Sequence, residues 1–177
     1  MKKTFLILLL AIAISGCQQK EEPKSQYQFP TGPVQVAPVQ IQDDVKILQE
    51  AVKKDPHNVN AWIKMGNILM DASRFNEAIE AYKKALDIDP KNIDVRVDMG
   101  TCYRYSGRPD LAVQEYRKGL EINPRHQNSR KNLAIVLAYD MNDRKQAIKE
   151  FEKYLELFPN APEAERVKQE IQKLKTS

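Results

Sequence analysis

Residues that do covalent or metal chemistry are scarce in this chain of 177 residues. It has two cysteines, Cys17 and Cys102, and two histidines, His57 and His126. Each histidine lies just after a proline in a predicted loop, and nothing clusters with it at the spacing of a metal site. No phosphate-binding loop, nucleophile elbow or zinc-protease motif occurs either. The sequence therefore predicts no catalytic residue, no metal site and no cofactor.

Cys102 stands between Gly100 and Tyr103 in a segment with a helical pattern. We interpret it as a small buried residue, because structural cysteines are among the most buried residue types. If Cys17 is modified, Cys102 has no partner for an internal disulfide. An enzyme or thiol carrier of the cell envelope that uses Cys102 remains an alternative, and the accessibility of the thiol would decide it.

The N-terminus has the pattern of an export signal, a basic start over residues 1–3 and an apolar run over residues 5–14. The run is too short to span a bilayer. Ile14-Ser15-Gly16-Cys17 resembles the lipobox of bacterial lipoproteins. That resemblance implies a signal peptide over residues 1–16, cleavage before Cys17 and lipidation of Cys17, which would anchor the chain to a membrane. Ordinary signal cleavage after residues 11–13 is the alternative.

Residues 17–40 are predicted to be the lipidated cysteine and a disordered tether rich in proline and glutamine. Glutamine, not aspartate, follows Cys17, which favours the outer membrane if lipoproteins are sorted as in enteric bacteria. The expected location is the bacterial cell envelope, at the outer membrane and facing the periplasm. Whether Tyr27 and Phe29 pack on the domain is left open.

The charge pattern argues against a nucleic-acid partner. The formal net charge is +4 and the isoelectric point is near 8.9. Basic and acidic residues are interspersed at helical spacing and form no basic stripe. Most of these charges are therefore expected to be solvated surface.

The rest of the chain carries an internal repeat. Pro56, Pro90, Pro124 and Pro159 fall 34, 34 and 35 residues apart. The segments between them share large, small and aromatic positions, and the third has one extra residue near 141–144. The first carries Trp62, Met65, Gly66, Leu69, Ala78, Tyr82 and Ala85; the second Arg96, Met99, Gly100, Tyr103, Ala112, Tyr116 and Gly119; the third Leu133, Ala134, Leu137, Ala147, Phe151 and Tyr154.

These positions resemble the signature of tetratricopeptide (TPR) repeats, pairs of helices that stack into a solenoid. The small residues are expected where helices cross, and the prolines end each second helix. In the turn of repeat two, Gly107 suits a left-handed helix end and Pro109 a first helical turn. The predicted fold is all-α, an α-solenoid of three repeats, at 59–92, 93–126 and 127–161.

Two further helices are predicted at the ends of the array. Residues 41–58 have the pattern of a second helix whose first helix is missing, with Leu48, Ala51 and Pro56 in matching positions. Residues 162–177 form a one-sided capping helix, with Asn160 as its N-cap and Glu163 three residues on. Such a helix closes the exposed end of a solenoid.

In the TPR family the first helices line a concave groove that binds other proteins. Carried over residue by residue, the resemblance implies that this groove offers amide, basic and tyrosine side chains to a protein or extended peptide. Ordinary solvated groove residues are the alternative. The predicted contact residues are Lys64, Asn67, Asp98, Thr101, Arg104, Tyr105, Lys131, Asn132, Ile135 and Tyr139.

One TPR subclass binds a C-terminal carboxylate with five conserved basic and asparagine side chains. Only Asn67 matches that set here, since Ile63, Asp98, Asn128 and Asn132 occupy the other places. A clamp of that type is therefore not expected.

Together these features predict a membrane-anchored adaptor or scaffold of the envelope, without catalytic activity, that holds a partner by binding alone. A narrower alternative is an assembly factor for an envelope machine, such as outer-membrane barrel insertion or pilus and secretin biogenesis.

Overall fold

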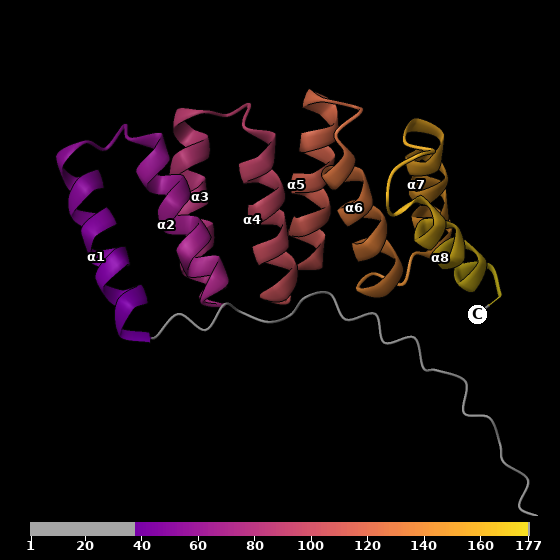
Figure 1. Ribbon diagram of the computed structural model, residues 1–177, viewed down its shortest axis with the longest axis horizontal. Coiled ribbons are helices and arrows are strands. Elements are labelled where there is room, and N and C mark those ends of the chain that lie inside the picture. Colours follow the sequence, from indigo (N-terminus) through magenta and orange to yellow (C-terminus); the bar gives the residue numbers. More distant parts are fainter. Residues whose placement is uncertain (1–37, 177) are drawn as a thin grey trace, which may run out of the picture. The chain divides into compact units, whose positions relative to one another are not determined.

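The computed structural model describes residues 38–176, and these form eight α-helices and no strand (Figure 1). The predicted signal peptide, Cys17, Tyr27, Phe29 and most of the tether lie outside the described residues. Helices adjacent in the chain pack on one another, so the all-α solenoid is confirmed. The helices are α1 (Pro38–Lys54), α2 (Val59–Asp71), α3 (Phe75–Ile88), α4 (Ile93–Tyr105), α5 (Pro109–Ile122), α6 (Gln127–Tyr139), α7 (Arg144–Leu157) and α8 (Ala164–Thr176).

The prolines set where the helices stop. A proline disfavours the helical conformation in the residue before it, so each helix ends two residues upstream. This rule holds for α1 before Pro56, α3 before Pro90, α5 before Pro124 and α7 before Pro159.

Each turn inside a repeat places one residue in the left-handed conformation. The turn residues are Ser73 with φ 58°, Gly107 with φ 78° and Asn142 with φ 53°. The prediction for Gly107 is confirmed, and Pro109 begins α5 as expected. Ser73 was not anticipated, because serine does not mark a left-handed position as glycine does. The extra residue of the third repeat lies in the α6–α7 turn.

The small positions of the repeat lie against buried tyrosine rings. A Cβ on Gly66 would fall 2.5 Å from Cε1 of Tyr82, and one on Gly100 would fall 2.6 Å from Cε1 of Tyr116. Both rings are at most 1% exposed. Glycine therefore lets α2 approach α3, and α4 approach α5, closely enough to bury the tyrosines.

A second repeated contact ties each first helix to the proline before it. Nε1 of Trp62 donates to the Pro56 carbonyl at 2.9 Å. Arg96 occupies the same position in repeat two, where Nη2 donates to the Pro90 carbonyl at 2.7 Å. In repeat three Nη2 of Arg130 donates to the Pro124 carbonyl at 2.8 Å. Arginine thus replaces the signature tryptophan without loss of this hydrogen bond.

Each of the two arginines forms an ion pair with a glutamate, which tryptophan does not require. Nη1 of Arg96 pairs with Glu115 at 2.9 Å, and Arg130 pairs with Glu150. In repeat one, Ala81 takes the position that corresponds to Glu115 and Glu150. The exchange is therefore coupled, because a largely buried arginine requires a carboxylate and tryptophan does not.

The first helices of the three repeats share one N-cap geometry. The side chains of Asn58, Asn92 and His126 accept a hydrogen bond from the backbone N–H three residues on, at 3.0, 3.1 and 3.2 Å. His126 therefore does more than a polar loop residue would. Its Nδ1 caps α6, while its Nε2 lies 3.2 Å from Oδ1 of Asp94 on α4.

The ends of the array differ from the prediction in two details. Helix α1 begins at Pro38, so residues 38–40 are helical and not tether, because proline is compatible with a first helical turn. Asn160 does not cap α8, which begins at Ala164 after a turn in which the Ala161 N–H bonds to the Phe158 carbonyl. Glu163 instead reaches toward Lys131 and Tyr154.

Between residues 38 and 176, no helix combines the length and the apolar character that crossing a membrane requires.

Candidate functional site

The first helices form the inner side of the array. Helix α2 contacts α4, and α4 contacts α6. Within the described residues, α3, α5 and α7 make no contact of similar extent with one another. The array is therefore more closely packed along the first helices, which is the geometry of a concave surface in a solenoid.

The α2–α4 part of this surface is polar. Lys64 and Asn67 are exposed on α2. The carboxamide oxygen of Asn67 accepts a hydrogen bond from the Tyr82 hydroxyl at 2.8 Å. At the same position of repeat two, the Thr101 hydroxyl donates to the Val97 carbonyl at 2.9 Å and lies 3.2 Å from the Tyr116 hydroxyl. These two predicted contact residues therefore also orient the buried tyrosines.

Asp98 is the most perturbed carboxyl of the surface. It is partly buried on α4, and this burial raises its pKa to about 6, with smaller contributions from the charges of Asp94 and Asp71. A raised pKa means that the fold favours the neutral acid. The site therefore presents a carboxyl that changes charge in the pH range around 6.

Arg104 and Tyr105 form the edge of the surface at the C-terminal end of α4. Nε of Arg104 donates to Oδ2 of Asp140 at 2.7 Å, which links α4 to the end of α6. The Tyr105 ring stacks on Phe75 with 5.4 Å between centroids, and the tyrosine remains 49% exposed. Sequence reasoning missed Phe75 and Asp140, since neither lies at a groove position of the repeat.

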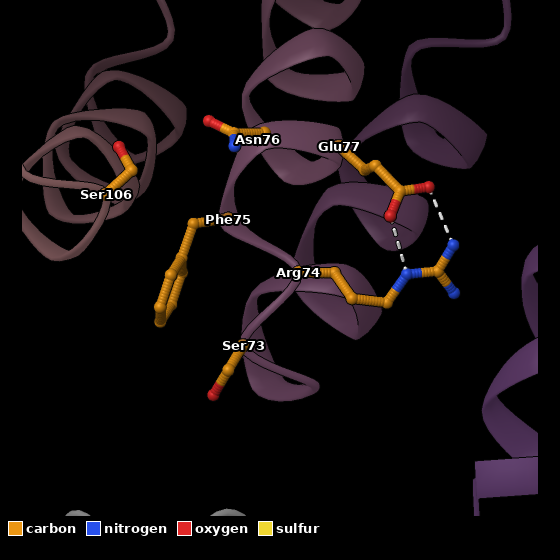
Figure 2. Close-up of a pocket in the computed structure, with 6 residues that line it drawn as sticks. All are labelled: Ser73, Arg74, Phe75, Asn76, Glu77 and Ser106. Atoms are coloured by element: carbon orange, nitrogen blue, oxygen red, sulfur yellow. Dashed lines mark hydrogen bonds and ion pairs between the residues drawn. The ribbon is translucent and has the colours of Figure 1, made fainter.

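A hollow of about 270 Å³ lies next to this edge, at the start of α3. Figure 2 shows the side chains that line it. Arg74 and Glu77 pair within it through bonds of 2.7 and 2.6 Å, so their charges offset each other. Through the stacked Phe75 the hollow adjoins Tyr105. Its lining residues are Ser73, Arg74, Phe75, Asn76, Glu77 and Ser106.

Side chains from the α8 region reach the surface of repeat three. Lys131 donates to Glu163, just before α8, at 3.2 Å, and the Tyr139 hydroxyl bonds to Glu170 on α8. Ile135 lies between them on α6 and is only 6% exposed. A side chain this buried offers little area to a partner, and Ile135 as a groove contact stays a prediction. Asn132 is partly exposed.

Cys102 lies inside the array. It is fully buried, and this burial, together with the charge of Asp98, raises the pKa of its thiol to about 12. A thiol that is protonated and inaccessible is a poor nucleophile. Within residues 38–176 no three histidine, cysteine or carboxylate side chains gather as metal ligands would.

Comparison with known proteins agrees with this architecture. Residues 36–165 match the family model described as the cytochrome c-type biogenesis protein H TPR domain. No curated protein sequence matches the chain.

Solved structures with a similar fold share little sequence with the chain. The crystal structure of MamA protein gives a TM-score of 0.68 at 21% identity, over 77% of this chain and 74% of that one. A second MamA crystal structure gives a TM-score of 0.63 at 18% identity, over 77% of this chain and 88% of that one. The first TPR of Spaghetti (RPAP3), bound to an HSP90 peptide, gives a TM-score of 0.60 at 21% identity, over 68% of this chain and 93% of that one. At this level of identity the likeness shows the fold.

Proposed function

Because the chain belongs to the tetratricopeptide-repeat family, in the group of the cytochrome c-type biogenesis protein H TPR domain, we propose that it is a protein-binding scaffold. Its partner is a protein or extended peptide held on the inner surface of the first helices. The observation that carries this proposal is the arrangement of that surface. Exposed Lys64, Asn67 and Tyr105 lie on closely packed helices, outside the buried core.

The more open part of the surface is the α2–α4 half, since Lys131 and Tyr139 of repeat three bond to Glu163 and Glu170. Tyrosine and arginine are frequent binding hot spots, and both are present at the Arg104–Tyr105 edge. The Spaghetti structure holds an HSP90 peptide, which supports a peptide as the ligand class. The side chains that hold carboxylates in the chaperone-binding subclass are mostly replaced here, so a different peptide chemistry is proposed.

Site-specific crosslinking in cells tests the location of the partner. A photoreactive residue in place of Lys64 or Tyr105 should capture a discrete protein, whereas one in place of the exposed Lys149, on α7, should not. The variant Lys64→Glu with Tyr105→Ala should lose the partner and keep its helical content. If position 149 captures the same partner as strongly as position 64, the binding surface lies on the second helices.

The scaffold is proposed to be anchored to a membrane of the bacterial cell envelope, facing the periplasm, through lipid on Cys17. The support for the anchor is the lipobox-like sequence after a basic and apolar start. In Cys17→Ser the precursor should stay unprocessed or leave the membrane fraction. Normal maturation and unchanged fractionation of that variant would disprove the anchor and leave the scaffold proposal intact.

A narrower function, assembly factor for an envelope machine, has one observation in its favour. The matching family model is described by a biogenesis role, that of cytochrome c-type biogenesis protein H. Deleting the gene and measuring the levels of outer-membrane barrels, secretins and c-type cytochromes would identify such a role. A catalytic role through Cys102 has no support from its buried and protonated thiol.

A further inference from the structure

Helix α1 packs in the array as a second helix of a repeat. It contacts α2 in the way that α3 contacts α4. Its valines Val45 and Val52, both buried, lie at the positions of Ile79 and Leu86 on α3, which are buried too. The first helix that would complete a repeat with α1 is not among the described residues.

On α1, the side chains that such a first helix would bury are at least partly exposed to solvent. The equivalent positions of α3 are Ala78, Ala81, Tyr82 and Ala85, and none is more than 2% exposed. On α1 these positions are Asp44, Ile47, Leu48 and Ala51, and we call them the α1 face. Ile47 is 67% exposed, and the other three are partly exposed.

The sequence between Cys17 and α1 is a poor source for the missing helix. Pro23, Pro30 and Pro33 divide it into short runs, and none reaches the 13 residues of α2. Proline inside a helix removes a hydrogen bond and clashes with the preceding turn. A helix of another molecule is the better occupant of the α1 face.

We propose that the α1 face binds the same face of a second copy of this chain, with the two α1 helices antiparallel. The charges of α1 favour this arrangement. Asp43 and Asp44 lie toward its start and Lys54 lies at its basic end, where Lys53 pairs with Glu50 of the same helix at 2.6 Å. An antiparallel crossing near Leu48 brings the acidic part of each copy beside the basic end of the other, whereas a parallel pair would align like charges.

Such a contact is isologous, so it closes at two copies and does not extend into a filament. It covers an aliphatic centre of Ile47 and Leu48 with charged ends. Because only one helix per copy takes part, the dimer is small and depends on concentration. It leaves the α2–α4 surface free and is independent of the proposed groove binding.

Sedimentation of the full chain in detergent, over a range of concentrations, tests the dimer. The parent should shift from monomer to dimer as concentration rises. Ile47→Glu should stay monomeric with unchanged helical content, because the side chain is already exposed. Gln49→Glu is the matched control, since it adds the same charge to an exposed position of α1 outside the face, and it should dimerise like the parent. A parent that stays monomeric throughout would overturn the proposal.

Cysteine crosslinking tests the antiparallel orientation. Copies with Asp43→Cys mixed with copies with Lys54→Cys should form a disulfide-linked dimer, while neither variant alone should. Leu48→Cys, close to the crossing point, should crosslink to itself. Strong self-crosslinking of Asp43→Cys would indicate a parallel pair, and crosslinking of Ile47→Cys to an unrelated protein in place of a second copy would identify a different occupant. Either result would overturn the assignment.

Discussion

At the scale of single residues, Gly100 offers a test in which packing opposes helix propensity. Alanine is favoured over glycine inside a helix by up to about 1 kcal/mol. Yet a Cβ here would fall 2.6 Å from a Tyr116 ring that is buried and whose hydroxyl lies beside Thr101. We therefore expect Gly100→Ala to destabilise the fold by about 1–3 kcal/mol, measured by denaturant unfolding.

The exposed Lys84 on α3 is the control for this variant, and Lys84→Ala should stay within about 0.5 kcal/mol. Lys118 is less suitable, since it bonds to the buried carboxylate of Glu115. A Gly100→Ala variant as stable as the parent would show that α4 and α5 can separate without cost.

Asp98 makes stability depend on pH in a known direction. Its pKa is raised from 3.8 to about 6, so folding favours the neutral acid. The contribution of Asp98 to the free energy of unfolding is complete below pH 4 and is lost as the pH rises through 6. Asp98→Asn removes the charge. The free energy of unfolding of this variant should therefore exceed that of the parent by about 2 kcal/mol at pH 7.5, and by much less at pH 4. Unfolding curves at both pH values measure the difference, and parallel pH profiles would contradict the assignment.

The repeat signature identified some of these residues and not others. Gly66 and Gly100 could be predicted because small residues recur there at one period, and Gly107 because it lies in a turn just before the helix that Pro109 begins. His126 as an N-cap could not, since histidine is uncommon there, although its alignment with Asn58 and Asn92 carries the signal. The perturbed pKa of Asp98 depends on how deeply α4 is packed, which no spacing in the sequence reveals.

At the scale of elements, repeats one and two use different residue pairs where the first helix meets the second. Arg96 pairs with Glu115, whereas repeat one has Trp62 and Ala81 at the corresponding positions. Glu115→Ala should cost about 2–3 kcal/mol, because it leaves the charge of Arg96 largely buried and unpaired. Adding Arg96→Trp copies the repeat-one pair and should recover most of that loss, since the indole can donate to the Pro90 carbonyl as Trp62 does to Pro56.

A double-mutant cycle on unfolding free energies measures this coupling. Arg96→Trp alone should also destabilise, because it leaves Glu115 with only the half-exposed Lys118. If the two single effects simply add in the double variant, the pair is not a unit.

The helices could be predicted from sequence because prolines and turns mark their ends. The groove could be predicted less well, because several predicted contact residues bind within the chain. Arg104 pairs with Asp140, and Lys131 and Tyr139 bond to the α8 region. A repeat alignment shows which positions face inward, but it does not show that Glu163 and Glu170 bond to side chains of α6. The usable surface is therefore narrower than the sequence implied.

At the scale of the whole array, each helix contacts mainly its neighbours, so stability should be transmitted locally. Ile171 on α8 is buried at the C-terminal end of the array. Ile171→Ala should cost about 2 kcal/mol or more, and the loss should be concentrated near α8. Amide hydrogen exchange should become faster in α6 and α7 than in α2 and α3. Lys168→Ala, on the exposed side of α8, should leave exchange unchanged. Equal acceleration in all helices would show instead that the array unfolds as one cooperative unit and that α8 stabilises even the distant α2–α4 surface.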